Sequence, residues 1–206
     1  KEMQTPNIDA LTSEGVVFTD AHVAATVSSP SRACLITGRY GHRFGYECNL
    51  SDRTNGLPLE EETIAEVFKT NGYRTAAIGK WHLGSRDEQH PNNRGFDLFY
   101  GMKAGGRDYF YNEKKSDRPG DERNLLLNDR QVKFEKYLTD AFSEKAVEFI
   151  NESSQPFMMY LAYNAVHTPM QATDEDMAKF EGHPRQKLAA MTYALDRGVG
   201  IDFFLK

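Results

Sequence analysis

The feature that most constrains this chain is the segment 28–39, which reads Ser-Ser-Pro-Ser-Arg-Ala-Cys-Leu-Ile-Thr-Gly-Arg. Pro30 suits the first turn of a helix, where its missing N–H costs no hydrogen bond, and Gly38 suits the left-handed residue that ends one. Ser28 then lies at the helix N-terminus, where free N–H groups and the helix dipole favour an anion. Arg32, one turn further on, can offer a planar set of donors to the same anion. The segment therefore predicts a short helix with an oxyanion site at its N-terminus.

Helix and strand patterns alternate along the rest of the chain. Apolar residues at helical spacing predict helices over 60–71, from Thr139 and from Leu188. The runs 73–79 and 157–162 have the composition of strands. The second run is apolar throughout, which is typical of a strand buried on both faces in a parallel sheet. The alternation predicts an α/β fold with a largely parallel sheet.

Shorter signals complete the pattern. Thr5 as cap and Pro6 at the first helical position predict a helix that Gly15 ends. The residues 16–19 form a short β-rich run, and 125–132 predicts a hairpin about an Asn-Asp turn.

Polar side chains follow both predicted parallel strands. Lys80 and His82 come directly after the run 73–79, and His167 follows the run 157–162. In open α/β sheets, ligands bind outside the C-terminal ends of the strands. Lys80 and His82 are two residues apart, so in extended geometry both would face one side. A histidine titrates near neutral pH and can transfer a proton without a large pKa shift.

Composition excludes several classes of protein. The 206 residues suffice for one domain with a real core. A net charge of -5 gives no sign of a nucleic-acid partner, and no apolar run is long enough to span a membrane. Cys34 and Cys48 are too few for a disulfide framework or a zinc site.

The order of residues in 28–39 resembles the signature of the type I sulfatases: Cys or Ser, any residue, Pro, Ser, Arg, three residues, Leu, Thr, Gly, Arg. Ser28 occupies the nucleophile position, and Ile36 stands at the leucine position. Other segments resemble the same family. These are the helix-like stretch 5–19, the Lys-x-His pair at 80–82, Gly-Phe-Asp at 95–97, His-x-Pro at 167–169 and the helix with Asp196.

The resemblance implies an alkaline-phosphatase-like fold, a mixed but mostly parallel sheet flanked by helices, of which residues 1–206 would be part of the N-terminal, catalytic domain. It implies a sulfuric ester hydrolase in which Ser28 is oxidised to formylglycine, the nucleophile and a calcium ligand. Arg32, Lys80 and His82 would hold the sulfate oxygens and the nucleophile, and His167 would protonate the leaving group. Asp196 is expected to be a structural partner.

The resemblance also implies partners and a setting. A sulfated carbohydrate or an aryl sulfate ester would be the substrate, and a formylglycine-generating radical enzyme would mature Ser28. A serine in this position suggests an anaerobic bacterium, although an engineered change from cysteine gives the same residue. The family resemblance implies a periplasmic or secreted bacterial enzyme of polysaccharide degradation.

The family's remaining metal ligands do not occur in this chain. There is no Asp-Asp pair anywhere, and no later strand ends in Asp-Asn or Asp-His. Calcium normally takes six to eight oxygen ligands, so Ser28 alone would hold it weakly. We therefore expect residues 1–206 by themselves to be a poor or inactive catalyst, whereas a parent enzyme that carries both missing segments should be active.

Two alternatives to a sulfatase remain open at this point. A phosphatase or phosphodiesterase of the same superfamily could use unmodified Ser28, because fold alone does not decide the reaction. A non-catalytic remnant that binds sulfated glycans would also keep the cationic residues. In either case the polar stretch 103–123 reads as a surface excursion, from which Arg107 and Tyr109 could contact a sugar or aryl group.

Overall fold

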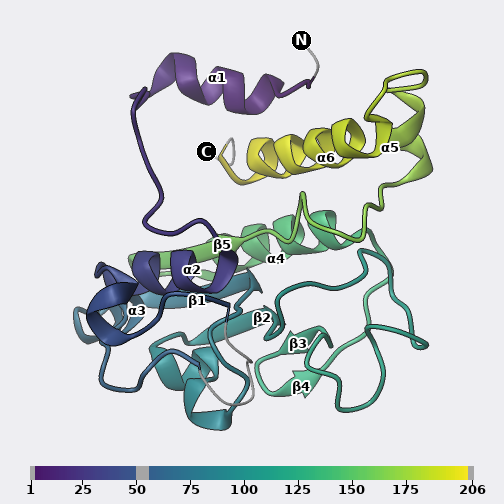
Figure 1. Ribbon diagram of the computed structural model, residues 1–206. Coiled ribbons are helices and arrows are strands. Elements are labelled where there is room, and N and C mark those ends of the chain that lie inside the picture. Colours follow the sequence, from purple (N-terminus) through teal and green to yellow (C-terminus); the bar gives the residue numbers. More distant parts are fainter. Residues whose placement is uncertain (1–2, 50–55, 204–206) are drawn as a thin grey trace.

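A computed structural model describes residues 3–49 and 56–203, which form a sheet with helices on both faces (Figure 1). The helices are α1 (Pro6–Glu14), α2 (Ser28–Thr37), α3 (Ile64–Thr70), α4 (Leu138–Glu152), α5 (Asp174–Ala178) and α6 (Gln186–Phe203), with 3-10 turns η1 (Gly41–Phe44), η2 (Asp87–Gln89) and η3 (Pro91–Arg94). The strands are β1 (Arg74–Lys80), β2 (Leu98–Met102), β3 (Leu126–Leu127), β4 (Arg130–Gln131) and β5 (Phe157–Ala162). No described helix is both long and apolar enough to cross a bilayer.

The sheet has the order β4-β3-β2-β1-β5. β1 lies between β2 and β5 and pairs in parallel with both, whereas β3 and β4 extend the sheet as an antiparallel hairpin. The expected α/β fold, its parallel strands and the hairpin about Asn128 are confirmed. The expectation that β5 is buried on both faces is wrong: it lies at the edge of the described sheet, and most of its residues are only half-buried.

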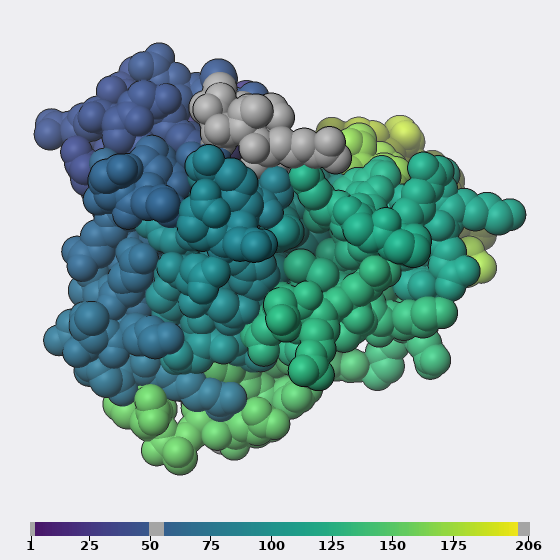
Figure 2. Space-filling model, turned by 90° about the horizontal axis from the view of Figure 1, so that it is seen from below, coloured from purple at the N-terminus to yellow at the C-terminus, as the bar shows by residue number. Residues whose placement is uncertain are grey.

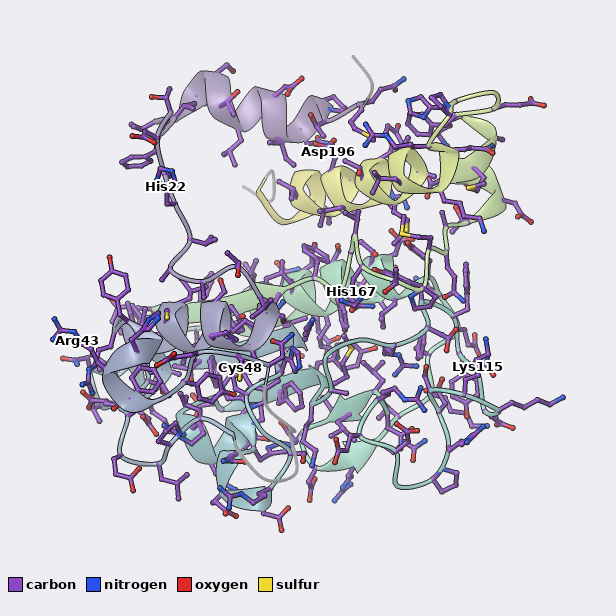
Figure 3. All side chains as sticks on the ribbon, in the orientation of Figure 1. His22, Arg43, Cys48, Lys115, His167 and Asp196 are labelled. Carbon is purple, nitrogen blue, oxygen red and sulfur yellow. The ribbon has the colours of Figure 1, made fainter. Side chains whose placement is uncertain are left out.

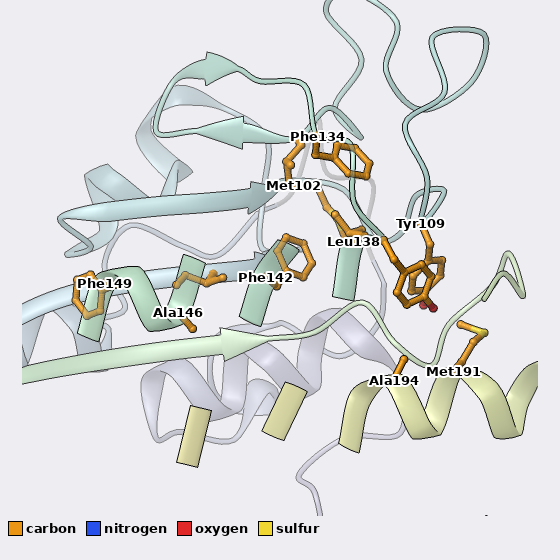
Figure 4. Packing of buried hydrophobic residues seen from close by; sticks show 13 residues of the cluster. Met102, Tyr109, Phe134, Leu138, Phe142, Ala146, Phe149, Met191 and Ala194 are labelled. Atoms are coloured by element: carbon orange, nitrogen blue, oxygen red, sulfur yellow. The ribbon is translucent and has the colours of Figure 1, made fainter. Parts of the chain in front are cut away.

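Alternating side chains of β1 supply the two halves of the core. Ala76 and Ile78 pack on one face with Phe142 of α4 and Met191 of α6, as Figure 4 shows for the α4 and α6 residues. Ala77 faces the other way and joins the cluster under α2 and α3. Because successive strand residues point to opposite faces, one short strand holds both helical layers in place.

Two helices begin at residues that differ from the predicted ones. α3 begins at Ile64, after Thr63. The Thr63 hydroxyl accepts from the Glu66 N–H while the Glu66 carboxylate accepts from the Thr63 N–H, a reciprocal cap. α4 begins at Leu138, so Thr139 lies inside the first turn and does not cap it.

The residues 16–19 do not form a strand, so that prediction is wrong. They belong to an extended arm that connects α1 to α2 (Figure 1). Val16 and Phe18 are 83% and 79% exposed. Apolar, β-branched residues favour a strand only where a neighbouring strand and a packed face exist, and the described residues offer this arm neither.

Helix α1 takes its N-terminal cap from the far end of the chain. The Thr5 hydroxyl makes no cap hydrogen bond to the helix. Instead, the carboxylate of Asp196 on α6 accepts from the backbone N–H groups of Asn7 and Ile8, at 3.0 and 2.8 Å. Figure 3 shows Asp196 on the side of α6 that faces α1. The expectation that Asp196 is a structural partner is thereby confirmed, and the cap predicted at Thr5 is corrected.

Replacing Asp196 by alanine should destabilise the chain without touching the site described below. Asp196 is fully buried, and its loss leaves donors at the start of α1 without an acceptor. We expect the free energy of unfolding to fall by about 0.5–2 kcal/mol, the range for a lost helix cap. Urea unfolding followed by circular dichroism measures it. Asp174→Ala, an exposed acidic residue in the first turn of α5, is the control, and an equal loss in both variants would contradict the assignment.

Candidate active site

Ser28 lies in the first turn of α2, as the sequence predicted. Gly38 ends that helix in the left-handed conformation, with φ of 66°, and donates its N–H to the Cys34 carbonyl. The Ser28 Oγ is 2.8 Å from the Nδ1 of His82 and accepts from the Arg32 Nε at 3.2 Å. These residues come from α2 and from the end of β1. The structure thus brings together residues that the chain separates by more than fifty positions.

Arg32 is held in place by two further acceptors. Its Nη1 donates to the Lys80 carbonyl at 2.7 Å and to the Tyr160 hydroxyl at 2.9 Å. Burial raises the pKa of Tyr160, with Arg32 acting in the opposite direction, so the phenol stays neutral and can accept. Sequence analysis missed Tyr160 because it stands in the apolar run of β5. Its one available signal was a hydroxyl within an otherwise apolar strand.

His82 has a backbone conformation that the sequence did not predict. Its φ is 58°, so it is left-handed and not extended. The Ser29 hydroxyl donates to the His82 carbonyl at 2.7 Å, which ties this residue to the start of α2. Ser29 is itself fully buried. The turn aims the ring of His82 at Ser28.

The His82 ring is neutral near pH 7. Burial lowers its pKa to about 4, with smaller contributions in the same direction from Lys80, Arg32 and His167. Arg32 donates to the Ser28 oxygen, so the serine proton is available for the His82 Nδ1. In the tautomer that carries its proton on Nε2, the His82 Nδ1 accepts the Ser28 proton.

This depressed pKa predicts the pH dependence of stability. Between the ordinary histidine value of 6.5 and about 4, the unfolded chain binds a proton that folded His82 does not. The contribution of His82 to the unfolding free energy should therefore decrease as pH falls through this window, and change no further below it. Histidine Cε1–H NMR signals, assigned with His82→Gln, would follow the titration. A His82 midpoint at or above 6 would contradict the prediction.

Lys80 and His167 complete the group of basic residues. Lys80 ends β1 and is 4% exposed. His167 lies in an exposed turn after β5, beneath α6 (Figure 3). Its Nδ1 is 2.7 Å from the Thr168 carbonyl. Because a carbonyl only accepts, Nδ1 carries a proton and Nε2 is the nitrogen left for exchange with a substrate.

A pocket of about 460 Å³ joins these elements. It is lined by residues 23, 25–28, 31, 32, 35, 80, 160 and 163–167. The residues that line it include Arg32, Lys80 and His167 but no Asp or Glu. A helix N-terminus with three basic side chains and no carboxylate suits an oxyanion such as sulfate.

The same donor set does not suit calcium. Calcium prefers carboxylate and carbonyl oxygens, and among the described residues no group of three or more His, Cys, Asp or Glu could hold a metal ion. Ser28 is the one expected ligand that reaches the pocket. The described residues therefore do not form a calcium site.

Arg107 and Tyr109 are both buried. This corrects the expectation that they contact a sugar or aryl group of a substrate. Arg107 is 2% exposed, and its guanidinium pairs with the carboxylate of Asp117 at 2.7 and 2.8 Å. Tyr109 is fully buried, with its hydroxyl on the backbone of the His167 turn. The polar segment 103–123 thus has a buried interior. The chain between β2 and α4, to which it belongs, nevertheless covers much of the lower face of the molecule (Figure 2).

Comparison with known proteins agrees with this geometry. The family model described as Sulfatase matches residues 1–197. The chain belongs to the sulfatase family. It is 35% identical over 228 residues to the uncharacterized sulfatase YdeN of Escherichia coli K12, and 37% identical over 198 residues to arylsulfatase G of Mus musculus. The alignments cover 96% and 82% of this chain, but 39% and 38% of those proteins.

A solved structure shares the fold. The structure of Ps i-CgsB superposes with a TM-score of 0.90 at 43% identity, over 98% of this chain and 49% of that one. A second structure of Ps i-CgsB is a complex with k-i-k-neocarrahexaose, with a TM-score of 0.88 over 96% of this chain and 48% of that one. The expected alkaline-phosphatase-like sulfatase fold is confirmed. The chain spans about 40% of the length of the two curated relatives.

Proposed function

We propose that residues 1–206 are part of the catalytic domain of a sulfuric ester hydrolase that uses Ser28, matured to formylglycine. One observation carries the proposal. The Ser28 oxygen lies within hydrogen-bonding distance of both His82 and Arg32, on a pocket whose lining is basic and lacks carboxylates. A maturation enzyme that oxidises this serine would be a partner.

The residues around Ser28 suit the modification. Ser28 lines the open pocket, so a second oxygen on its Cβ has space. When present, the hydrated aldehyde supplies the oxygen that attacks sulfur. His82, neutral near pH 7, accepts the proton of that oxygen. Arg32 and Lys80 hold the charge that builds up on the sulfate oxygens, a stabilisation that acts most strongly in the transition state.

His167 would act on the leaving group. A sugar alkoxide is a poor leaving group, so the bridging oxygen needs a proton as the S–O bond breaks. The imidazolium of His167 can donate it from Nε2 while Nδ1 remains on the Thr168 carbonyl. The alcohol departs, His167 is left neutral, and the sulfate remains bonded to the oxygen of residue 28. The second hydroxyl of the hydrate then loses its proton and expels the sulfate, which restores the aldehyde. Calcium, which the family resemblance implies for the complete enzyme, would have Ser28 as its one expected ligand among the described residues.

For the substrate we propose a sulfated oligosaccharide. The support is the likeness to Ps i-CgsB, solved in complex with k-i-k-neocarrahexaose. That oligosaccharide is the first compound to test, with an aryl sulfate as a general probe. Release of sulfate from either supports the proposal. Saturable binding without release, in protein whose residue 28 is matured, would instead support a glycan-binding role.

The contact between Ser28 and His82 also favours a second candidate, a phosphatase or phosphodiesterase with unmodified serine. A neutral imidazole 2.8 Å from the hydroxyl could accept its proton directly. Mass spectrometry of the peptide across residue 28, from the native host, distinguishes the two. Loss of two hydrogen atoms and a preference for aryl sulfate support the sulfatase. An intact serine and a preference for aryl phosphate support the phosphatase.

A further inference from the structure

The backbone turn that carries His167 is fastened to one buried side chain. The Tyr109 hydroxyl accepts from the His167 N–H at 3.0 Å and lies 2.8 Å from the Asn164 carbonyl, to which it donates. Burial raises the pKa of Tyr109 to about 12, so the phenol keeps its proton and can donate and accept at once. The hydroxyl thus bridges the beginning and the end of the turn.

Further hydrogen bonds join the same two segments. Gln171 accepts from the Tyr109 N–H at 2.8 Å and donates to the Asp108 carboxylate at 2.9 Å. The Asn164 amide donates to the Arg107 carbonyl at 3.3 Å. The buried ion pair between Arg107 and Asp117 also holds this segment in place. The contacts make 107–109 a rigid support for the turn.

Two glycines place the same segment against both histidine rings. A Cβ built on Gly105 would lie 2.7 Å from the Cε1 and Nε2 atoms of His82. A Cβ on Gly106 would lie 3.2 Å from the Nδ1 of His167. The first distance is shorter than real Cβ contacts allow, and the second leaves little room. The backbone at 105–106 therefore passes directly against the ring of each histidine.

We propose that residues 105–109 are a positioning element that sets the two histidines relative to Ser28. Gly105 and Gly106 allow the backbone to contact the rings, and Tyr109 fixes the turn from which His167 projects. The inference deepens the proposed function and rests on it for the role of His167 as the acid. A displacement of about 1 Å at a reacting group can cost on the order of 100-fold in rate, so such a support matters to catalysis.

The first test needs no catalysis. In the 206-residue chain with ¹³C-labelled histidine, Tyr109→Phe removes only the hydroxyl. It should shift or broaden the Cε1–H NMR signal of His167, assigned with His167→Gln, and leave that of His22 unchanged. Tyr111→Phe, two residues away with its hydroxyl on Glu113, is the matched control. A His167 signal unchanged in Tyr109→Phe would overturn the proposal for Tyr109.

Gly105→Ala tests the glycine pair by the same spectrum. Gly105 has no positive φ, so alanine strains no backbone and acts through its methyl group on His82. The His82 signal should move by more than that of His167. Equal small changes in all histidine signals would overturn the role of Gly105.

The second test uses the complete, matured enzyme and two leaving groups. A nitrophenolate leaves without a proton, whereas a sugar alkoxide requires one. Tyr109→Phe should lower kcat about tenfold or more on a sugar sulfate, on the scale of general acid catalysis, and about twofold or less on 4-nitrophenyl sulfate. Equal losses on both would mean that Tyr109 only supports the fold. If the unaltered enzyme hydrolyses neither sulfate, the proposed function fails while the NMR tests still decide the positioning.

Discussion

Ser28→Ala is expected to abolish sulfate-ester hydrolysis by the complete enzyme. The substitution removes the atom that lies between His82 and Arg32, and no other described hydroxyl has both partners. Loss of a nucleophile typically costs on the order of 10⁴- to 10⁶-fold in kcat. Release of 4-nitrophenolate from 4-nitrophenyl sulfate, followed by absorbance, measures the loss.

The matched control is Ser13→Ala. Ser13 is exposed on α1, where its hydroxyl donates to the Ala10 carbonyl, so turnover should stay within about twofold of the unaltered enzyme, as for most surface changes. Thermal unfolding of both variants checks that they fold. Turnover by Ser28→Ala within tenfold of the starting enzyme would show that another group attacks sulfur.

Arg32→Lys should be the second most damaging change, although it keeps the positive charge. A lysine has no planar set of donors, so it cannot contact Ser28, the Lys80 carbonyl and the Tyr160 hydroxyl together as Arg32 does. We expect kcat to fall about 100- to 1000-fold, the cost of removing a donor that stabilises transition-state charge.

Tyr160→Phe separates the position of Arg32 from its charge. It removes one acceptor of Arg32 and leaves the guanidinium in place. A hydrogen bond to a charged group is worth about 1.5–3 kcal/mol, so kcat should fall about ten- to 100-fold, less than in Arg32→Lys. The control for Arg32→Lys is Arg43→Lys, which makes the same substitution at an exposed residue of the turn η1. Equal rates for Arg32→Lys and Arg43→Lys would refute the role given to Arg32.

Local sequence was sufficient where local chemistry decides the structure. Pro30 and Gly38 define α2, the strand-like composition of 73–79 defines β1, and the Asn-Asp pair defines the hairpin of β3 and β4. The residues predicted around the anion were those that follow strand ends or begin a helix. Their meeting at one pocket followed from the topology of a parallel sheet.

Contacts between distant segments account for what the sequence could not predict. The left-handed turn at His82 depends on Ser29 of another element, and Tyr160 acts through Arg32, far away in the chain. Tyr109 looked like a surface residue because its neighbours are polar. The partners that bury it, Asn164 and Gln171, lie more than fifty residues further on. Spacing along a chain does not report such pairings.

The cap that Asp196 provides to α1 has a consequence for biosynthesis. Asn7 and Asp196 are 189 positions apart, and α1 has no buried residue of its own. At synthesis rates of about 5–20 residues per second, α6 emerges from the ribosome about 10–40 s after α1. Short isolated helices are marginal in water, so α1 has no stable docking site during that interval. Helix α1 can therefore complete its packing only after α6 has been synthesised, and a chaperone would find it and its apolar arm exposed until then.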